Sequence, residues 1–169
     1  MKRFLLIMLF ALSSTTLWAQ YGALRVNLLP LAVGVVEAGV DLAIAERHSV
    51  DVAAAWSPQL EGSCAVSVGL RRWRFEPHVG WFVGSYATYS SFEVGGSSGW
   101  LAGLGGSVGY SWILSRRWNF SVEGGVGLSY LEDSFWLDDT STLEDLVLRT
   151  RRRVVLCPSR MEASFSYLF

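Results

Sequence analysis

The last nine residues of the chain, 161–169, restrict its fold more than any other segment. Apolar and polar side chains alternate along them, and a period of two is typical of a strand between two different environments. One face carries Met161, Ala163, Phe165, Tyr167 and Phe169, and the other carries Glu162, Ser164, Ser166 and Leu168. The chain therefore needs a sheet with one apolar and one polar surface.

The chain ends on this strand, with an aromatic residue in the last position. This arrangement resembles the terminal signature of bacterial outer-membrane β-barrels, and we interpret Phe165, Tyr167 and Phe169 as a barrel-assembly signal. The resemblance implies a protein whose apolar face contacts lipid in the outer membrane.

The start of the chain predicts export. A positive segment, residues 1–3, precedes an apolar run over 4–12 and a small-residue site that ends at Ala19, which is the layout of a secretory signal peptide. The alternative is a membrane anchor, but this run is well short of the ~20 residues that a spanning helix needs. We expect residues 1–19 to be removed and residues 20–169 to form one domain.

The composition fits a transmembrane barrel. Hydrophobic residues make up 51% of the chain and the mean hydropathy is +0.31. The most apolar later segment, 28–45, contains Pro30, Glu37 and Asp41, so a lipid-facing helix there would be costly. Eight Trp, six Tyr and nine Phe could form the aromatic girdles of a barrel. A soluble lipocalin-type periplasmic barrel stays open as an alternative, and the net charge of −1 argues against nucleic acid.

Alternation along the chain predicts eight strands, at about 23–29, 34–44, 50–56, 64–72, 78–86, 100–112, 118–130 and 161–169. Aromatic and aliphatic residues share one face of each strand, and glycines, serines and charges share the other. Phe82 and Tyr86 are exceptions that would point inward. A soluble lipocalin has the opposite pattern, so the sequence predicts an all-β, eight-stranded, antiparallel, up-and-down transmembrane β-barrel with both termini on the periplasmic side.

The predicted connections alternate in length. Short charged turns follow the second, fourth and sixth strands, at 46–48, 71–76 and 116–117, and longer loops follow the third, fifth and seventh. The fifth strand would lead into a loop at 95–99, and the seventh into a long polar loop at 132–153. Short periplasmic turns and long outer loops are typical of bacterial barrels.

Charged side chains on the inward faces are the first candidates for function: Arg25, Glu37, Asp41, Asp51, Arg71, Glu123 and Glu162. Arg25 and Asp41 would lie at similar heights on neighbouring strands, as would Glu123 and Glu162. They could form a path for protons or ions, or a buried salt-bridge network. We favour the network, because the lumen of an eight-stranded barrel is just wide enough for side chains to fill it.

The predicted loop at 132–153 is a candidate binding surface. Ser141 and Glu144 form a capping-box pattern, and Leu143, Leu146, Val147 and Leu148 would give a short helix an apolar side. Four arginines follow: Arg149, Arg151, Arg152 and Arg153. They could bind lipopolysaccharide phosphates, or the loop could fold on itself through internal ion pairs, and the sequence favours neither.

The sequence offers little for catalysis. His48 and His78 lie in or beside periplasmic turns, too far from the outer leaflet to activate a nucleophile there. A two-carboxylate protease built on Asp138, Asp139, Glu144 and Asp145 stays open, although acidic loops are mostly solvated. Cys64 and Cys157 could form one disulfide or remain two thiols. We expect no enzyme activity, no metal and no cofactor.

Several segments resemble an uncharacterised domain-of-unknown-function family of small Gram-negative outer-membrane β-barrels. They are residues 23–29, 77–81 leading to 92–96, 109–112 with 116–119, and 158–164. The resemblance implies a barrel that is often encoded beside fimbrial or surface-assembly genes, and it implies no catalytic residues. The expected partners are outer-membrane lipid, lipopolysaccharide, the barrel-assembly machinery and fimbrial or other surface proteins. A small pore and an outer-leaflet lipid-modifying enzyme are the rival functions.

Overall fold

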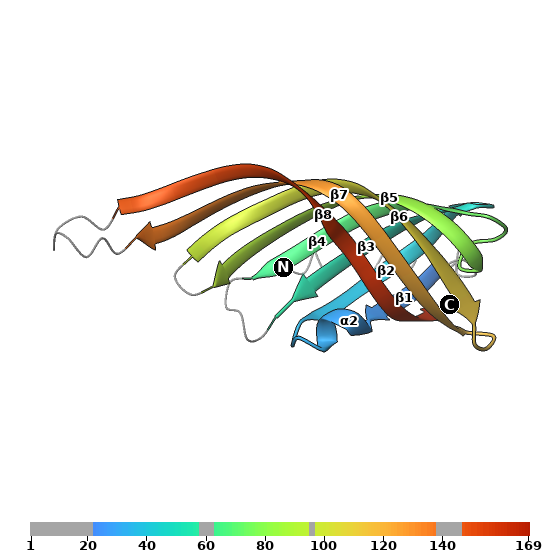
Figure 1. The fold of residues 1–169 in the computed structure, drawn as a ribbon. Coiled ribbons are helices and arrows are strands. Elements are labelled where there is room, and N and C mark those ends of the chain that lie inside the picture. Colours follow the sequence, from blue (N-terminus) through green and yellow to red (C-terminus); the bar gives the residue numbers. More distant parts are fainter. Residues whose placement is uncertain (1–21, 58–62, 95–96, 138–146) are drawn as a thin grey trace, which may run out of the picture.

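The computed structural model describes residues 22–57, 63–94, 97–137 and 147–169, and they form a closed barrel of eight antiparallel strands (Figure 1). The strands are β1 (Gly22–Asn27), β2 (Val36–Ala45), β3 (His48–Trp56), β4 (Cys64–Trp73), β5 (Gly80–Val94), β6 (Ser97–Ile113), β7 (Trp118–Leu137) and β8 (Val147–Leu168). Each strand pairs with the next along the chain, and β8 pairs with β1. The predicted all-β, eight-stranded, up-and-down architecture is confirmed.

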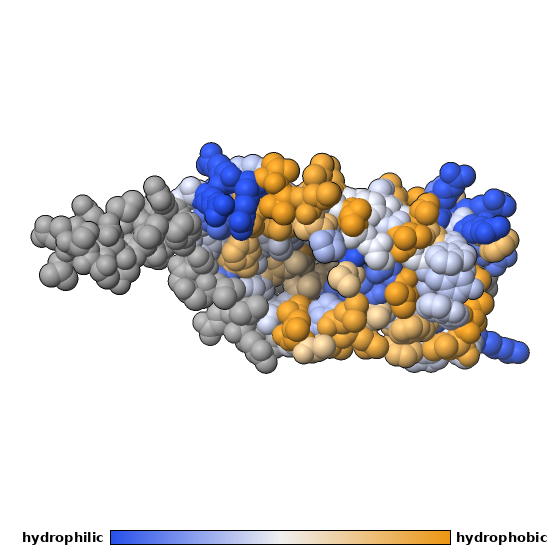
Figure 2. All heavy atoms as spheres, in the orientation of Figure 1, coloured by the Kyte–Doolittle hydropathy of each residue, from blue (hydrophilic) through white to orange (hydrophobic). Residues whose placement is uncertain are grey.

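The two faces of the wall have opposite chemistry. Outward side chains are apolar and exposed, for example Leu104 at 69% and Val126 at 63%, whereas inward Asp51 and Ser164 are fully buried. Figure 2 shows apolar residues over the middle of one side of the barrel and strongly polar ones toward its two ends. This distribution is the reverse of the apolar lumen that a soluble lipocalin-type barrel would have.

The strands are steeply inclined to the barrel axis. Following the pairings from Phe165 through β1 and around the wall leads back to β8 at Val154, nearer the opposite end of the same strand. This stagger is what closes a sheet into a barrel, and it corresponds to a tilt of about 40°.

The wall is low on one side and high on the other. Strands β1 to β4 have 6 to 10 residues, whereas β5 to β8 have 15 to 22. In Figure 1, β7 and β8 extend well beyond the low side. The longer strands extend beyond the shorter ones at one end of the barrel, which we call the loop end. We call the opposite end the turn end, and there residues 46–47, 74–79 and 114–117 connect the strands.

The first strand is shorter than predicted because a helix replaces its end. The Asn27 side chain accepts a hydrogen bond from the backbone N–H of Leu29 at 3.2 Å and caps the short helix α2 (Leu28–Leu31). Asparagine is a preferred helix N-cap, and it stops the extended conformation two residues before the predicted boundary at Leu29. All four residues of α2 remain outside the core.

Two predicted loops are wrong, because strands occupy most of their residues. Only residues 95–96 separate β5 from β6, and β7 and β8 continue through most of the predicted loop at 132–153. Alternation fails there because polar residues follow one another over 132–134 and 149–153, and apolar residues follow one another over 135–137 and 147–148. Cross-strand pairs hold the extension instead: Arg152 Nε donates to Glu132 Oε2 at 2.9 Å, and the hydroxyls of Ser134 and Thr150 lie 3.3 Å apart.

Several predictions fall on residues outside the described ranges. They are the signal peptide at 1–19, the helix at 141–146, and the acidic residues Asp138, Asp139, Glu144 and Asp145. Val147 and Leu148, expected in that helix, lie in β8. Over the described ranges, no helix has the length and apolar character needed to cross a membrane.

Candidate functional site

Buried ionic side chains fill the middle of the barrel. We call this group the lumen cluster; its members are Arg25, Arg71, Arg160, Asp41, Asp51, Glu123 and Glu162. Their side chains are at most 9% exposed, although they come from β1, β2, β3, β4, β7 and β8. The cluster therefore ties together strands that are distant in sequence.

Arg71 lies at the centre of the lumen cluster. Its guanidinium forms a salt bridge with Asp41 at 2.5 Å, a second with Glu123, and longer contacts with Glu162 at 3.3 Å and Asp51 at 3.8 Å. It also lies over the ring of Phe82, 5.0 Å from the centroid. A single guanidinium thus contacts carboxylates from four strands, β2, β3, β7 and β8.

Arg25 and Arg160 are the other two cations of the cluster. Arg25 forms salt bridges with Asp51 and Glu162. Arg160 contacts Asp51 at 2.5 Å and Glu123 at 2.9 Å. Isolated buried charges cost several kcal/mol, so each ion in the cluster depends on its partners to stay charged away from water.

Aromatic side chains close the lumen below the cluster, toward the turn end. Trp73 and Phe82 are 3% and 2% exposed, and their ring centroids lie 4.5 Å apart. His78 adopts a left-handed backbone conformation, with φ of 67°, that folds its turn into the barrel. Its carbonyl oxygen accepts hydrogen bonds from Ser111 Oγ at 2.8 Å and Asn119 Nδ2 at 2.6 Å.

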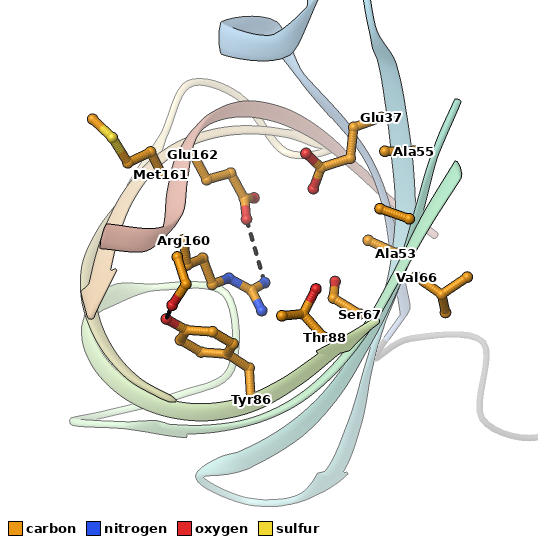
Figure 3. A pocket seen from close by; sticks show the side chains of 12 residues that line it. Glu37, Ala53, Ala55, Val66, Ser67, Tyr86, Thr88, Arg160, Met161 and Glu162 are labelled. Carbon is orange, nitrogen blue, oxygen red and sulfur yellow. Dashed lines mark hydrogen bonds and ion pairs between the residues drawn. The ribbon is translucent and has the colours of Figure 1, made fainter. Parts of the chain in front are cut away.

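A cavity of about 180 Å³ lies above the cluster, toward the loop end. Figure 3 shows Glu37, Glu162, Arg160 and Tyr86 converging on it, while Met161 points away. Glu37 accepts a hydrogen bond from Asn27 Nδ2 at 3.0 Å and lies apart from the lumen cluster. The lumen is thus filled at the turn end and hollow at the loop end.

Inward glycines make room for the large side chains of the lumen. A Cβ at Gly105 would lie 2.5 Å from Tyr86 Oη and 2.6 Å from the backbone oxygen of Val126. Tyr86 itself is fixed by its hydroxyl, 2.5 Å from Ser159 Oγ, and by the guanidinium of Arg160 over its ring. The small residues that alternation places inside are therefore needed for packing.

We expect Gly105→Ala to lower the free energy of unfolding by about 1–3 kcal/mol, because the added methyl group overpacks the lumen against Tyr86. Gly106→Ala is the matched control, since its methyl group would meet only the backbone oxygen of Gly84, at 3.7 Å. Denaturant titration of both variants in lipid vesicles measures the difference. Equal midpoints would contradict this packing of the lumen.

The structure brings together six of the seven inward charges that the sequence predicts, and Glu37 is the exception. Glu123 and Glu162 are register partners, as their predicted heights require, but Asp41 pairs with Arg71 rather than with Arg25. Arg160 was missed. It shares the parity of Glu162, so extending the alternation of β8 by two residues would have found it.

The predicted arginine-rich loop is instead part of β8. Arg151, Arg152 and Arg153 are exposed strand residues, and Arg149 also lies in this strand. Arg152 forms a salt bridge with Glu132. The described part of the chain therefore has internal ion pairing at one of these arginines.

Of the two alternatives for the cysteines, the structure has the two thiols and not the disulfide. Cys64 and Cys157 are both free thiols. Cys64 Sγ lies 3.3 Å from Ser91 Oγ, whereas Cys157 Sγ lies 3.6 Å from Ser129 Oγ across the β7–β8 pair. Two cysteines in an exported chain permit a disulfide, but only the register decides whether they meet.

The remaining predicted residues lie at the turn end. Phe165 packs against Phe120 at 5.2 Å and Tyr167 against Trp118 at 5.2 Å, both on the outer face. Phe169 is 47% exposed, and its backbone N–H donates to the carbonyl oxygen of Gly22. Of the two histidines, His48 is exposed at the start of β3 and His78 is buried.

Two rows of aromatic side chains cross the outer face. The turn-side row consists of Trp81, Tyr110, Trp112, Phe120 and Phe165, with successive ring centroids 4.7–5.9 Å apart across β5 to β8. The loop-side row consists of Tyr89, Trp100 and Tyr130, at 6.2 and 5.4 Å. Phe120 and Tyr130 are ten residues apart on β7. At about 3.3 Å per residue and a tilt of about 40°, the rows are roughly 25 Å apart along the axis.

A family model described as "Protein of unknown function (DUF3575)" matches residues 4–169 of the chain. Comparison with curated proteins gave no match. Comparison with solved structures gave none either.

Proposed function

Because the chain belongs to the family described as "Protein of unknown function (DUF3575)", and that description names no activity, we propose a function from the barrel itself. The protein is an outer-membrane β-barrel with a side-chain-filled lumen and both termini in the periplasm. It acts without catalysis, as a structural or surface-interaction protein in envelope or fimbrial assembly. Its surroundings are outer-membrane lipid and lipopolysaccharide.

The proposal rests on the apolar side chains of the outer face. Exposed aliphatic side chains such as Leu104 and Val126 lie between the two aromatic rows. Transmembrane barrels have an apolar band about 25 Å tall flanked by aromatic girdles, and the rows are about that far apart. In a soluble protein these side chains would be in contact with water at a large cost in free energy, because most of them are exposed by 40% or more.

The filled lumen supports an interaction role over a pore. Trp73 and Phe82 occupy the turn end, and the lumen cluster occupies the middle. An ion would have to separate the cluster's salt bridges to pass. We therefore assign function to the outer face and the loop end.

Fractionation of cells tests the location. We expect the full-length protein to sediment with outer membranes, to resist extraction by high salt and carbonate, and to require detergent for release. The folded form should migrate differently from the boiled form in a detergent gel, as stable membrane barrels do. Recovery in the soluble periplasmic fraction would refute the proposal.

A further inference from the structure

One edge of β8 has no described strand paired with it beyond the point where β1 ends, toward the loop end. β1 pairs with β8 only from Ser164 to Leu168. Just above, the Asn27 side chain takes over, donating to the carbonyl oxygen of Met161 at 3.3 Å and accepting from the N–H of Ala163 at 3.1 Å. Beyond this point no described strand pairs with that side of β8, although β7 continues to pair with its other side. We call residues 154–160 the open edge.

The open edge lies at the level of the apolar belt, by which we mean the exposed apolar side chains between the two aromatic rows. Val154 and Leu156 point outward and are 67% and 72% exposed. Their partners on β7 are Tyr130, which belongs to the loop-side aromatic row, and Leu128. If the proposed membrane location holds, on which this inference rests, the open edge is inside the outer leaflet.

Unpaired backbone groups are not tolerated at that depth. Each N–H or C=O without a partner in hydrocarbon costs several kcal/mol, and membrane barrels close their sheets for this reason. Pro158 has no backbone N–H, but its carbonyl group and the backbone groups of the other residues in 154–160 remain. The edge therefore requires a partner that supplies backbone hydrogen bonds.

The wall beside the open edge has no described strand, although helix α2 lies close to part of β8. β2 begins only at Val36, and the loop-end cavity lies behind the gap, lined by Glu37 on one side and by Ser159 and Arg160 on the other. In Figure 2 the surface is hollowed beneath β8. An added strand needs a spacing of about 4.8 Å from β8, as between any paired strands.

A second copy of the chain does not fit as the partner. Two barrels with the same orientation in one membrane both have β8 running from the loop end to the turn end. Related by an axis along the membrane normal, their open edges would cross at about twice the strand tilt of about 40°. Such strands meet at one point and cannot exchange a ladder of hydrogen bonds.

The side chains beside the edge define the partner's chemistry. Outward Val154, Leu156 and Met161 favour apolar residues at alternate positions of the added strand. Toward the loop end, Arg151 and Arg153 are exposed, and no salt bridge joins them to a described carboxylate. Acidic residues at that end would complement them.

We propose that an extended segment of a partner chain adds to the open edge as an antiparallel strand. Its residues are apolar at alternate positions, and its C-terminal end is acidic and meets Arg151 and Arg153. This is strand addition to an exposed sheet edge, in which backbone bonds give affinity and side-chain matching gives specificity. It would complete the wall where β1 stops.

Hydrogen exchange of the full-length protein in detergent micelles tests this proposal. The probe is a synthetic ten-residue peptide of alternating valine and threonine that ends on two aspartates; the control peptide ends on two lysines. At a hundred times its dissociation constant, the aspartate peptide should slow exchange of the edge-facing amides in 151–161 about a hundredfold. Arg151→Gln combined with Arg153→Gln should weaken binding at least about tenfold.

Three results would overturn the proposal: edge-facing amides already protected without peptide, no slowing by the aspartate peptide, or equal slowing by the lysine peptide. The two arginines are exposed and lie outside the lumen cluster, so their replacement should leave the barrel folded. A protein that stays monomeric in buffer without detergent would refute the membrane location instead. The exchange experiment could then be repeated in buffer, which separates the two failures.

Discussion

Arg71→Met is expected to lower the free energy of unfolding by about 3–5 kcal/mol, because it removes the central cation of a buried ionic network. The guanidinium of Arg71 bridges Asp41 and Glu123, and both carboxylates are about 2% exposed. Methionine fills a similar volume but leaves these ions in the barrel without this cation. Denaturant titration of the protein in lipid vesicles measures the loss.

Arg72→Met is the matched control, because Arg72 is the next residue on β4 but points outward and is exposed. Removing Glu123 as well, by Glu123→Gln in the Arg71→Met background, should restore part of the stability. Such coupling between contacting groups is what a double-mutant cycle detects. Equal stability of Arg71→Met and Arg72→Met would contradict the assigned role of the lumen cluster.

Leu104→Arg is expected to lower the free energy of unfolding by about 2–4 kcal/mol in lipid vesicles, because it places a cation near the middle of the apolar belt. Leu104 is 69% exposed and lies on β6 between Trp100 and Trp112, which belong to the two aromatic rows. In water the same substitution on an exposed strand residue would be almost neutral. The size of the effect therefore reports on the solvent around β6.

Ile113→Arg provides the control for that substitution. Ile113 is 59% exposed and ends β6 beyond the turn-side aromatic row. A cation there reaches the interface, so we expect a loss of at most about 1 kcal/mol. Similar small effects of Leu104→Arg and Ile113→Arg would argue that water, and not hydrocarbon, surrounds the belt.

Which side chains of each strand point into the lumen was predictable from sequence, because this depends on local alternation. The inward positions of Phe82 and Tyr86 were predicted even though both are aromatic, and both are buried in the structure. Membership of an uncharacterised domain-of-unknown-function family was confirmed by the match over residues 4–169. Alternation also gave six members of the lumen cluster, since charges opposite apolar residues had to face the axis.

What sequence did not predict depends on contacts between distant residues. Alternation could have placed Arg160 inside the barrel, but not beside its partner Asp51, which is 109 residues away in the chain. The capping role of Asn27 needs Met161 and Ala163 beside it. The extensions of β7 and β8 each consist of a polar run next to an apolar run, 132–134 with 135–137 and 149–153 with 147–148, so they carry no period-two signal.

Whether the two cysteines pair could not be decided from sequence for a related reason. Two cysteines in a chain that is expected to be exported could form a bond. Cys64 and Cys157, however, lie on β4 and β8, which are not neighbours in the wall. Pairing of cysteines requires Cα atoms within about 7 Å, which only the register determines. The same register determines which inward arginine meets which carboxylate.

The proposed membrane location amounts to the claim that hydrocarbon surrounds the outer face of the barrel. Nitroxide labels on single cysteines at successive positions 102–108 of β6, in a Cys64→Ser, Cys157→Ser background reconstituted in vesicles, measure what surrounds this face. We predict that labels at outward Ala102, Leu104 and Val108 collide frequently with oxygen and rarely with a water-soluble nickel chelate. Frequent collision of the chelate with the label at Leu104 would contradict the claim.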